Sequence, residues 1–228
     1  MLKSDISEML QFFRELDQNN YPDWFESQRP RYDDLYRRWK SFVLELLPLV
    51  AAFDPDIARV TPHQISFRIQ RDTSYSQDPT PYKTYFDIFL APGGRSSMRA
   101  GYYFRLGPDT SRHPCRIFSG NCYYDPRTVR LLRDDISHGW EQFSNEVLSK
   151  AHPLFLPDTE GSLKRLPSSC PKDAPYAQWM LLRHFAIATP LDEAFVTAPN
   201  LPQRLASLFE TTKPFVDYVN RAVLYDGD

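Results

Sequence analysis

Charged side chains that could recognise an anion are gathered at Arg68, Arg71, Asp72 and Lys83, just ahead of a run of aromatic residues. An arginine guanidinium binds a carboxylate or phosphate through parallel N–H bonds, and a lysine ammonium adds a point charge. If the segments that carry these residues form a hairpin, Lys83 returns to the neighbourhood of Arg68 or Arg71. The pattern therefore predicts a cationic cleft for a small anionic ligand.

The same charges also have a structural interpretation. Arg71 and Asp72 would pair with neighbours and hold the following loop, while Lys83 would be a solvated charge that protects an edge strand from aggregation. The spacing leaves both interpretations open. If the protein is an enzyme, Asp72 is the acid–base candidate, because a carboxylate among cations stays ionised at neutral pH. Tyr82 and Tyr102 would add rings and hydroxyls to the cleft.

Other polar segments carry weaker chemical signals. Lys164 and Arg165 form a second compact basic site, which either extends the cleft or is an ordinary solvated loop. The charges of Arg37-Arg38-Trp39-Lys40 are interpreted as the solvated face of a helix whose Trp39 is in the core. The histidines are scattered and lack H-x-x-x-H spacing, so we expect no metal site and no other cofactor.

The composition is that of a globular chain. With 228 residues, 42% hydrophobic and 14% aromatic, it can form one large core rich in rings. A net charge of -2 argues against a broad nucleic-acid surface. Cys115, Cys122 and Cys170 lack C-x-x-C spacing, which favours a reduced, cytoplasmic setting. No uncharged apolar run is long enough to span a bilayer, so we expect no membrane partner.

The first part of the chain shows helical periodicity. Apolar spacing predicts a helix over 6–16, which Asn19-Asn20 would close in a left-handed turn. Pro30 fits the first turn of a second helix, whose buried stripe runs over 35–50. Pro48 should kink or end that helix.

The pattern then changes to that of strands. Alternating apolar and polar residues over 64–70 predict a strand with one buried face. Residues 84–90, 100–106 and 115–120 predict further strands, and 154–156 a short one. Because the connections between the central strands are too short for crossover helices, the sheet should be mainly antiparallel.

Helical signals return after the strands. Asp125-Pro126 is typical of a capped helix start, and the spacing over 174–185 predicts another helix. Residues 189–192 predict a capped start, and two terminal helices should flank Pro214. The predicted fold is therefore α+β: one domain over 1–228, with a central mainly antiparallel sheet flanked by N-terminal and C-terminal helices.

Several motifs occur along nearly the whole chain in a particular order: Asn19-Asn20 with Trp24-Phe25, Phe67-Arg68-Ile69 running into Arg71-Asp72-Thr73, Thr80-Pro81-Tyr82-Lys83-Thr84, Gly101-Tyr102-Tyr103, Leu163-Lys164-Arg165, and Pro214-Phe215-Val216-Asp217. In this order they resemble the DUF2461 family, a group of proteins without an assigned function. The resemblance implies a single α+β domain and directs attention to Arg71, Asp72, Tyr82 and Lys83, which fill the family's most recognisable motif. It implies no reaction.

The chain departs from the family pattern in the loop after this motif. Ser74, Gln77 and Pro79 stand at positions where the family commonly has cations. If such cations steer a ligand inward, the resemblance implies weaker binding here or a different ligand.

Two functions lead at this stage, and a third, processing of a single-stranded nucleic acid on aromatic platforms, is disfavoured by the charge balance. The first is a cytoplasmic protein that binds a small phosphate- or carboxylate-bearing ligand in the cationic cleft. The second is a protein-interaction module in which the cations are structural and an aromatic surface binds the partner. The aromatic residues considered for that surface are Tyr32, Tyr36, Tyr85, Phe86, Tyr123 and Tyr124.

Overall fold

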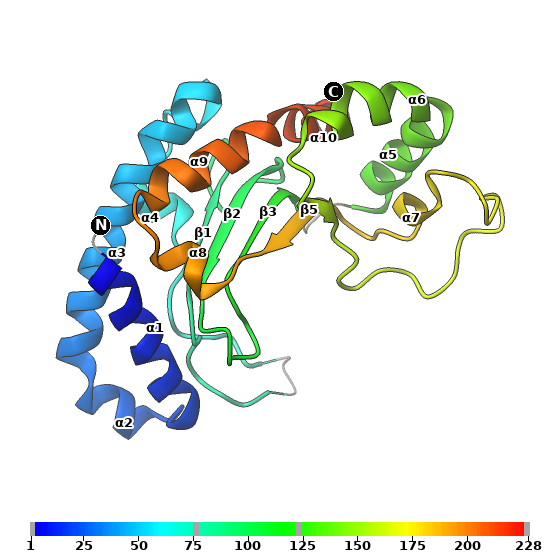
Figure 1. Ribbon diagram of the computed structural model, residues 1–228. Helices are drawn as coiled ribbons and strands as arrows, with labels where there is room; N and C mark the ends of the chain where they lie inside the picture. Colours follow the sequence, from blue (N-terminus) through cyan, green and yellow to red (C-terminus); the bar gives the residue numbers. More distant parts are fainter. Residues whose placement is uncertain (1–2, 75–77, 122–124, 226–228) are drawn as a thin grey trace.

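The computed structural model of the protein describes residues 3–74, 78–121 and 125–225. Within these residues, five strands form one antiparallel sheet in the order β1-β2-β3-β5-β4 (Figure 1). The strands are β1 (Phe86–Leu90), β2 (Gly101–Leu106), β3 (Arg116–Asn121), β4 (Leu156–Pro157) and β5 (Phe185–Pro190). The predicted single-domain α+β fold is confirmed.

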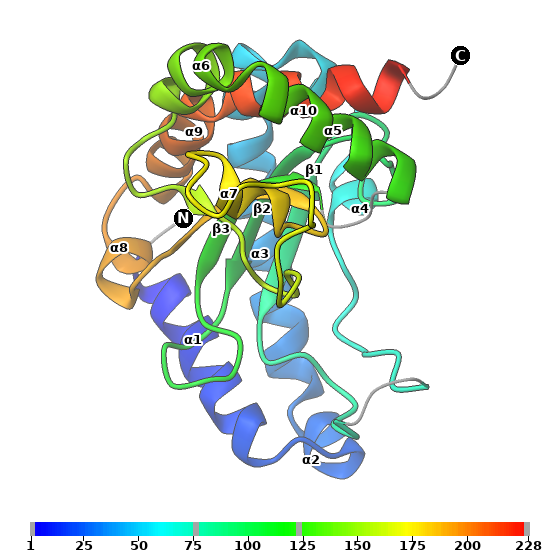
Figure 2. The same ribbon diagram turned by 90° about the vertical axis from the view of Figure 1, so that its right-hand side faces the viewer.

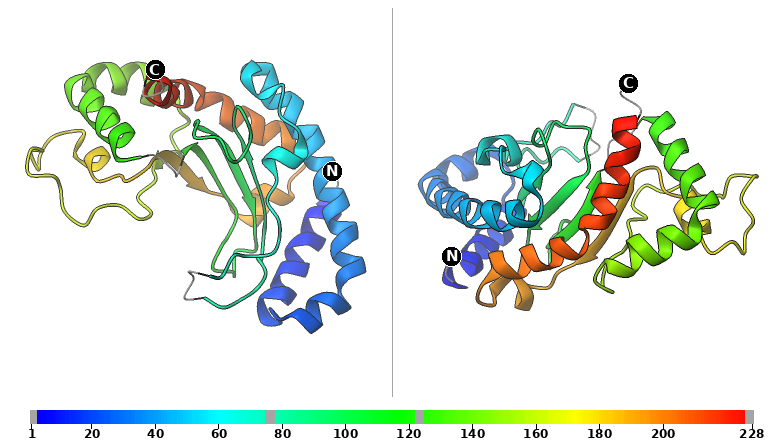
Figure 3. Two further views of the ribbon diagram at one scale, coloured as in Figure 1. Left: turned by 180° about the vertical axis from the view of Figure 1, so that it is seen from behind. Right: turned by 90° about the horizontal axis from the view of Figure 1, so that it is seen from above.

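The helices form two groups around the sheet. Those before it are α1 (Lys3–Gln18), α2 (Pro22–Ser27), α3 (Arg29–Phe53), the 3-10 turn η1 (Pro55–Ile57) and α4 (Pro62–Ile65). Those after it are α5 (Pro126–His138), α6 (Trp140–Gln142), the π-helical turn η2 (Phe143–Val147), the 3-10 turn η3 (Leu148–Lys150), α7 (Ala177–Met180), α8 (Glu193–Thr197), α9 (Leu201–Thr211) and α10 (Lys213–Tyr225). Figures 2 and 3 show α9 and α10 running across the sheet, with α1 to α3 on one side and α5 and α6 on the other.

One face of the sheet holds the hydrophobic core. Successive strand residues point to opposite faces, and on this face Tyr102 and Phe104 of β2 are fully buried. The ring of Trp39 on α3 lies 5.3 Å from that of Phe86 on β1. Phe209 on α9 lies 5.3 Å from Tyr102. The core is therefore rich in aromatic rings, as the composition predicts.

The opposite face of the sheet carries charged and aromatic side chains. Asp87 on β1, Arg105 on β2 and Arg116 on β3 are direct neighbours across the strands, so their side chains share this face. Tyr103 and Phe118 are also paired, and their rings stack with centroids 4.5 Å apart. This row of charged and aromatic side chains leads to the candidate site.

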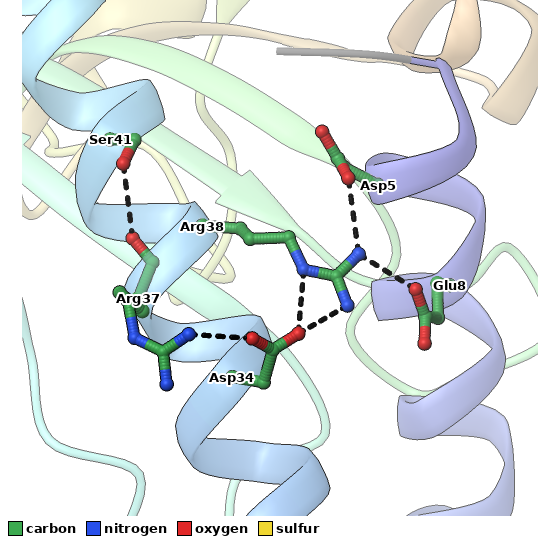
Figure 4. Close-up of polar contacts among 6 residues, drawn as sticks. All are labelled: Asp5, Glu8, Asp34, Arg37, Arg38 and Ser41. Carbon is green, nitrogen blue, oxygen red and sulfur yellow. Dashed lines mark hydrogen bonds and ion pairs between the residues drawn. The ribbon is translucent and has the colours of Figure 1, made fainter.

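An ion-pair network joins α1 to α3 (Figure 4). The Arg38 guanidinium donates to Asp5 at 3.0 Å and Glu8 at 2.7 Å on α1, and its Nε donates to Asp34 at 2.8 Å on its own helix. The Arg37 side chain is 69% exposed and donates to Asp34 at 2.7 Å, while its backbone carbonyl accepts from Ser41. The Arg38 side chain keeps 31% of its surface exposed, consistent with the predicted solvated face, and in addition it connects two helices.

The predicted strand over 64–70 is wrong. Its start is the short helix α4, because the Gln64 side-chain oxygen accepts the Thr61 N–H at 2.8 Å in a capping box. Beyond α4 the chain runs extended beside β1 and forms only isolated bridges, with the Phe67 N–H donating to the Asp87 carbonyl at 3.4 Å. This segment thus behaves as an irregular edge of the sheet.

The predicted helix over 174–185 is also wrong. Only α7 is helical there, and the chain then enters β5, whose residues pair with β3 along its whole length. The helix start predicted at 189–192 lies at the end of that range. The Asp192 carboxylate caps α8 by accepting the Phe195 N–H at 2.6 Å, and the helix begins at the next residue. The short strand predicted at 154–156 is found as β4.

Three helix signals have mixed outcomes. Helix α3 continues past Pro48 to Phe53, so Pro48 does not end it. Asn19-Asn20 follow the end of α1, but neither has the positive φ of a left-handed turn. Among the described non-glycine residues only Asn200 has one, so the predicted left-handed closure of α1 is wrong. The Asp125 cap is confirmed, and so are the two helices around Pro214.

The network in Figure 4 makes a stability prediction. Arg38→Met keeps the hydrocarbon stem but removes the cross-helix bonds, so the free energy of unfolding should fall by about 1 kcal/mol, with less loss at high salt. Urea denaturation measures this change. Arg37→Met is the matched control and should stay within about 0.5 kcal/mol of the wild type. Equal losses in both variants would show that the cross-helix bonds add nothing.

Candidate functional site

Two extended segments ahead of β1 pair as a hairpin and carry the charged motif. The Arg71 N–H donates to the Pro81 carbonyl at 2.9 Å, and the Lys83 N–H donates to the Ile69 carbonyl at 2.8 Å. The expected hairpin is therefore present. It places Arg71 and Lys83 on opposed strands of one short ladder.

The turn between α1 and α2 anchors this hairpin. The Asn20 side chain donates to the Tyr82 carbonyl at 2.9 Å and accepts the Tyr82 N–H at 3.1 Å. The Tyr82 ring stacks on Phe25 of α2, with centroids 4.1 Å apart and planes 19° apart. Tyr82 is buried, and its ring is therefore committed to the scaffold.

Three cations line one small pocket beside the hairpin, which we call the basic pocket. Arg71 and Lys83 line it together with Arg112 and His113 from the loop between β2 and β3, and its volume is about 70 Å³. Its carboxylates are Asp17 and Asp78, so cations outnumber carboxylates by three to two. The space corresponds to about two water molecules or one small oxyanion.

Asp78 lies between two of these cations. Its carboxylate accepts from Arg71 at 2.7 Å and lies 3.7 Å from Arg112. The N–H and hydroxyl of Thr80 donate to the same side chain at 3.0 and 2.8 Å. The pKa of Asp78 is lowered to about 2, chiefly by the bonds from Thr80 and further by Arg71. The chain therefore supplies an anion of its own among the residues that line the basic pocket.

Lys83 is held by a carboxylate within the sheet. Its ammonium donates to both oxygens of Asp87, at 3.0 and 3.1 Å, and lies 4.7 Å from the centroid of the Phe67 ring. Burial raises the pKa of Asp87, while Lys83 and the Tyr103 hydroxyl oppose the rise. Asp87 is thus a buried carboxylate that depends on Lys83 for its charge partner.

A second charged cluster continues along the same face of the sheet. Arg116 bonds the buried carboxylate of Asp158, and it pairs with the exposed Glu160 at 2.7 Å. His184 Nε2 lies 3.5 Å from Asp158. Burial alone would raise the pKa of Asp158, but His184 and Arg116 hold it below its usual value. In the part of the chain that the structure describes, no three His, Cys, Asp or Glu side chains are grouped as a metal would need.

Arg68 and Asp72 lie outside the basic pocket. Arg68 is exposed, and Asp72 lies in the exposed turn after the hairpin strand. The Asp72 carboxylate accepts the Ser74 N–H at 3.1 Å, and bonds from Ser74, with a smaller effect of Arg68, lower its pKa. The structure therefore gives Asp72 no contact with the pocket-lining cations.

The remaining predicted site residues are also placed elsewhere. Tyr102 is fully buried on the core face of β2, where its hydroxyl donates to Asp54 at 2.9 Å. Lys164 and Arg165 are exposed in the loop after β4 and do not line the basic pocket. Of the residues predicted for the cleft, the structure therefore brings together Arg71, Tyr82 and Lys83.

The aromatic surface considered for a protein partner is split by the fold. Tyr32 and Phe86 are core residues, while Tyr36 and Tyr85 are half-buried. Tyr123 and Tyr124 lie outside the described residues, as do Gln77 and Cys122. No helix in the described ranges is both long and apolar enough to cross a bilayer.

The profile of one protein family matches most of the chain. Its description is "Conserved hypothetical protein (DUF2461)", and the match covers residues 8–218. The chain belongs to the DUF2461 family. No curated protein and no solved structure shows significant similarity to it. The family membership thus confirms the resemblance seen in the motifs and adds no reaction.

Several residues at or beside the basic pocket were missed in the sequence. Arg112 and His113 are distant in the chain, and no spacing connects them with the motif. Asp87 did leave a signal, because it is a lone acid inside the apolar run of β1 and a buried charge needs a partner. The turn role of Asp78 was also predictable from the sequence, since a carboxylate two residues before Thr80 is typical of an Asx turn.

The Asn20 anchor can be tested by stability. Asn20→Ala removes both bonds to the Tyr82 backbone and leaves a part-buried N–H and carbonyl unsatisfied, so the free energy of unfolding should fall by about 2 kcal/mol. Asn19→Ala is the matched control, because the Asn19 side chain donates only within α1, to the Glu15 carbonyl at 2.9 Å. Its loss should be about 0.5 kcal/mol in urea denaturation. An Asn20 variant no less stable than the Asn19 variant would contradict the anchor.

The positive potential at the basic pocket can be read from His113. Burial lowers the pKa of His113, and Arg105, Arg112 and Arg71 lower it further. Because the side chain of Arg112 is 76% exposed, Arg112→Met should raise this pKa without disturbing packing. The folded state favours neutral His113, so its stabilising effect should be lost as the pH falls below about 6.5. NMR titration of the imidazole measures the pKa, with His113→Gln to assign the resonance, and urea denaturation at a series of pH values measures the stability. An unchanged pKa in Arg112→Met would contradict the shared potential.

Proposed function

We propose that the chain is a cytoplasmic protein that binds a small ligand through a phosphate or carboxylate group at the basic pocket. The observation that carries this proposal is the meeting of Arg71, Lys83 and Arg112, from three separate segments, around one hollow of about 70 Å³. Such a hollow accepts an oxyanion and little more, so the rest of the ligand would extend outside it. The cytoplasmic location is supported by the unspaced cysteines.

Arg71 and Arg112 would exchange Asp78 for the ligand, while Arg71 keeps its bond to the Thr80 carbonyl at 3.1 Å. Asp78 is a loop carboxylate that Arg71 and Arg112 share, and its side chain is about one quarter exposed, at 24%. A ligand anion of the same chemistry can take over these contacts, because a guanidinium has several N–H donors in one plane. Lys83 would contribute a fixed charge, since its partner Asp87 is buried within β1.

Competition between Asp78 and the ligand gives a direct test. Asp78→Asn removes the competing charge but keeps an oxygen that can accept the Thr80 N–H, so phosphate should bind about five-fold more tightly. Arg112→Met should weaken phosphate binding about three-fold. The measurement is the thermal shift with inorganic phosphate or acetate at constant ionic strength. A ligand at about 100 times its dissociation constant stabilises the fold by about 2.7 kcal/mol.

Matched controls separate the pocket from general charge effects. Asp72→Asn changes the same loop by the same chemistry, and Lys164→Met removes an exposed cation that does not line the pocket. Both should bind phosphate as the wild type does. Weaker binding in Asp78→Asn, or equal binding in Arg112→Met and the wild type, would overturn the proposal.

A further inference from the structure

A second and larger hollow lies at the other end of the molecule from the basic pocket. It is formed where α5, α6 and η2 pack beside the end of α10, a region that Figure 1 shows opposite α1 and α2. Its volume is about 590 Å³, which is within the range of about 300–1,000 Å³ typical of small-molecule sites. The hollow shares no lining residue with the basic pocket.

The floor of this hollow is apolar. Leu132 of α5, Phe143 and Val147 of η2, and Tyr218 of α10 all line it, and each is buried. The rings of Phe143 and Tyr218 lie 4.8 Å apart, which closes the floor between the two helices. Tyr225, at the end of α10, is 76% exposed at its edge. An apolar ligand body would therefore meet ring and aliphatic surface.

The rim carries an excess of carboxylates. Three carboxylates line the hollow, from Asp134, Asp135 and Glu146. Arg221 is the arginine among the described residues of the lining, which contain no lysine. The carboxylates outnumber the cations even when His138 is counted as protonated. The Tyr218 hydroxyl donates to Asp135 at 2.5 Å, so this carboxylate is fixed over the floor. An apolar floor beneath a negative rim complements a ligand that is apolar and cationic.

The turn η2 supplies an independent sign of function. It is a π-helical turn, a rare conformation that is frequent at functional sites, and it contributes to both layers of the hollow. Its Phe143 and Val147 are on the floor, while Glu146 is exposed on the rim and accepts from Gln142 at 3.0 Å. The widened turn thus combines apolar and acidic contacts within one short segment.

We propose that this hollow binds a small amphipathic amine. The apolar body lies against the floor of Phe143, Val147 and Tyr218, and the ammonium group lies among the rim carboxylates of Asp134, Asp135 and Glu146. The dimensions favour a small molecule, and the charge of the rim favours a cation over a neutral or anionic analogue. This site is independent of the anion proposed for the basic pocket.

Three probes that share one ring system test the charge requirement. Tryptamine, indole-3-ethanol and indole-3-acetate are titrated into the full chain, and backbone amide NMR shifts are followed. Tryptamine should move the amides of α5, η2 and α10 and bind about ten-fold more tightly than the alcohol, with the acetate weakest. Higher salt should reduce the difference. Equal binding of all three probes, or shifts confined to other elements, would overturn the proposal.

Variants locate the charge and the apolar contact separately. Glu146→Gln and Asp134→Asn should each weaken tryptamine binding about two- to five-fold and leave the alcohol unaffected. Glu141→Gln is the matched control, because Glu141 lies on α6 but does not line the hollow. Ala222→Leu, which adds bulk at a half-buried lining position, should weaken both probes.

The remaining outcomes also decide the question. If Glu141→Gln weakens tryptamine as much as Glu146→Gln does, the effect is general surface charge and the site is rejected. Binding of a basic peptide without binding of tryptamine would reject a small-molecule site in favour of a docking groove. Because Glu146 and Asp134 are exposed, their variants should fold even if Ala222→Leu does not.

Discussion

The buried carboxylate of Asp87 constrains everything around the candidate site. It sits in the middle of an apolar strand with 6% of its surface exposed, where an unpaired charge would be costly. Lys83, four residues ahead of Asp87 in the chain, supplies the compensating charge at 3.0 Å. The first segment of the hairpin runs beside β1, where the Phe67 N–H donates to the Asp87 carbonyl. The hairpin in turn is held by Asn20 on the turn between α1 and α2. One ion pair therefore couples the first helices, the charged motif and the sheet.

The alternation of strand side chains explains why core and site lie on opposite faces of one sheet. Tyr102 and Phe104 point to the helices and form the core, while Tyr103 and Arg105 point to the polar face. A residue can thus belong to a family motif and still have no access to a ligand. Tyr102 is such a residue, because it faces the core, whereas the next residue, Tyr103, shares the opposite face with Asp87.

The sequence specified the parts of the fold that have strong local signals. The predicted strands β1 to β3, the stripe on α3 and the cap at Asp125 were confirmed, because periodicity and capping act over a few neighbouring residues. The error at 64–70 was avoidable, since Thr61 and Gln64 have the spacing of a capping box. The strand β5 was not predictable in this way, because its pairing with β3 is set by a partner far along the chain.

The site was predictable only in part, for the same physical reason. The pairing of the segments that carry Arg71 and Lys83 was a condition of the predicted cleft, and the backbone bonds between them meet that condition. Arg112 and His113 reach the pocket through the tertiary fold, and their spacing carries no information about it. Likewise no local pattern indicates that Arg38 connects two helices, because Asp5 and Glu8, which it meets in addition to Asp34 of its own helix, are on α1.

Variants of the pocket cations differ in whether they test ligand binding or the stability of the fold. Lys83 neutralises a carboxylate within the sheet, so its loss would leave a buried unpaired charge at a cost of about 3–5 kcal/mol. A variant at Lys83 would therefore lose binding because the hairpin loosens, whatever the role of Lys83 toward a ligand. Arg112 is 76% exposed, and its pairing with Asp78 is long, at 3.7 Å. The contribution of this pocket to binding is consequently tested best with variants of Arg112 and Asp78, which lie outside the motif.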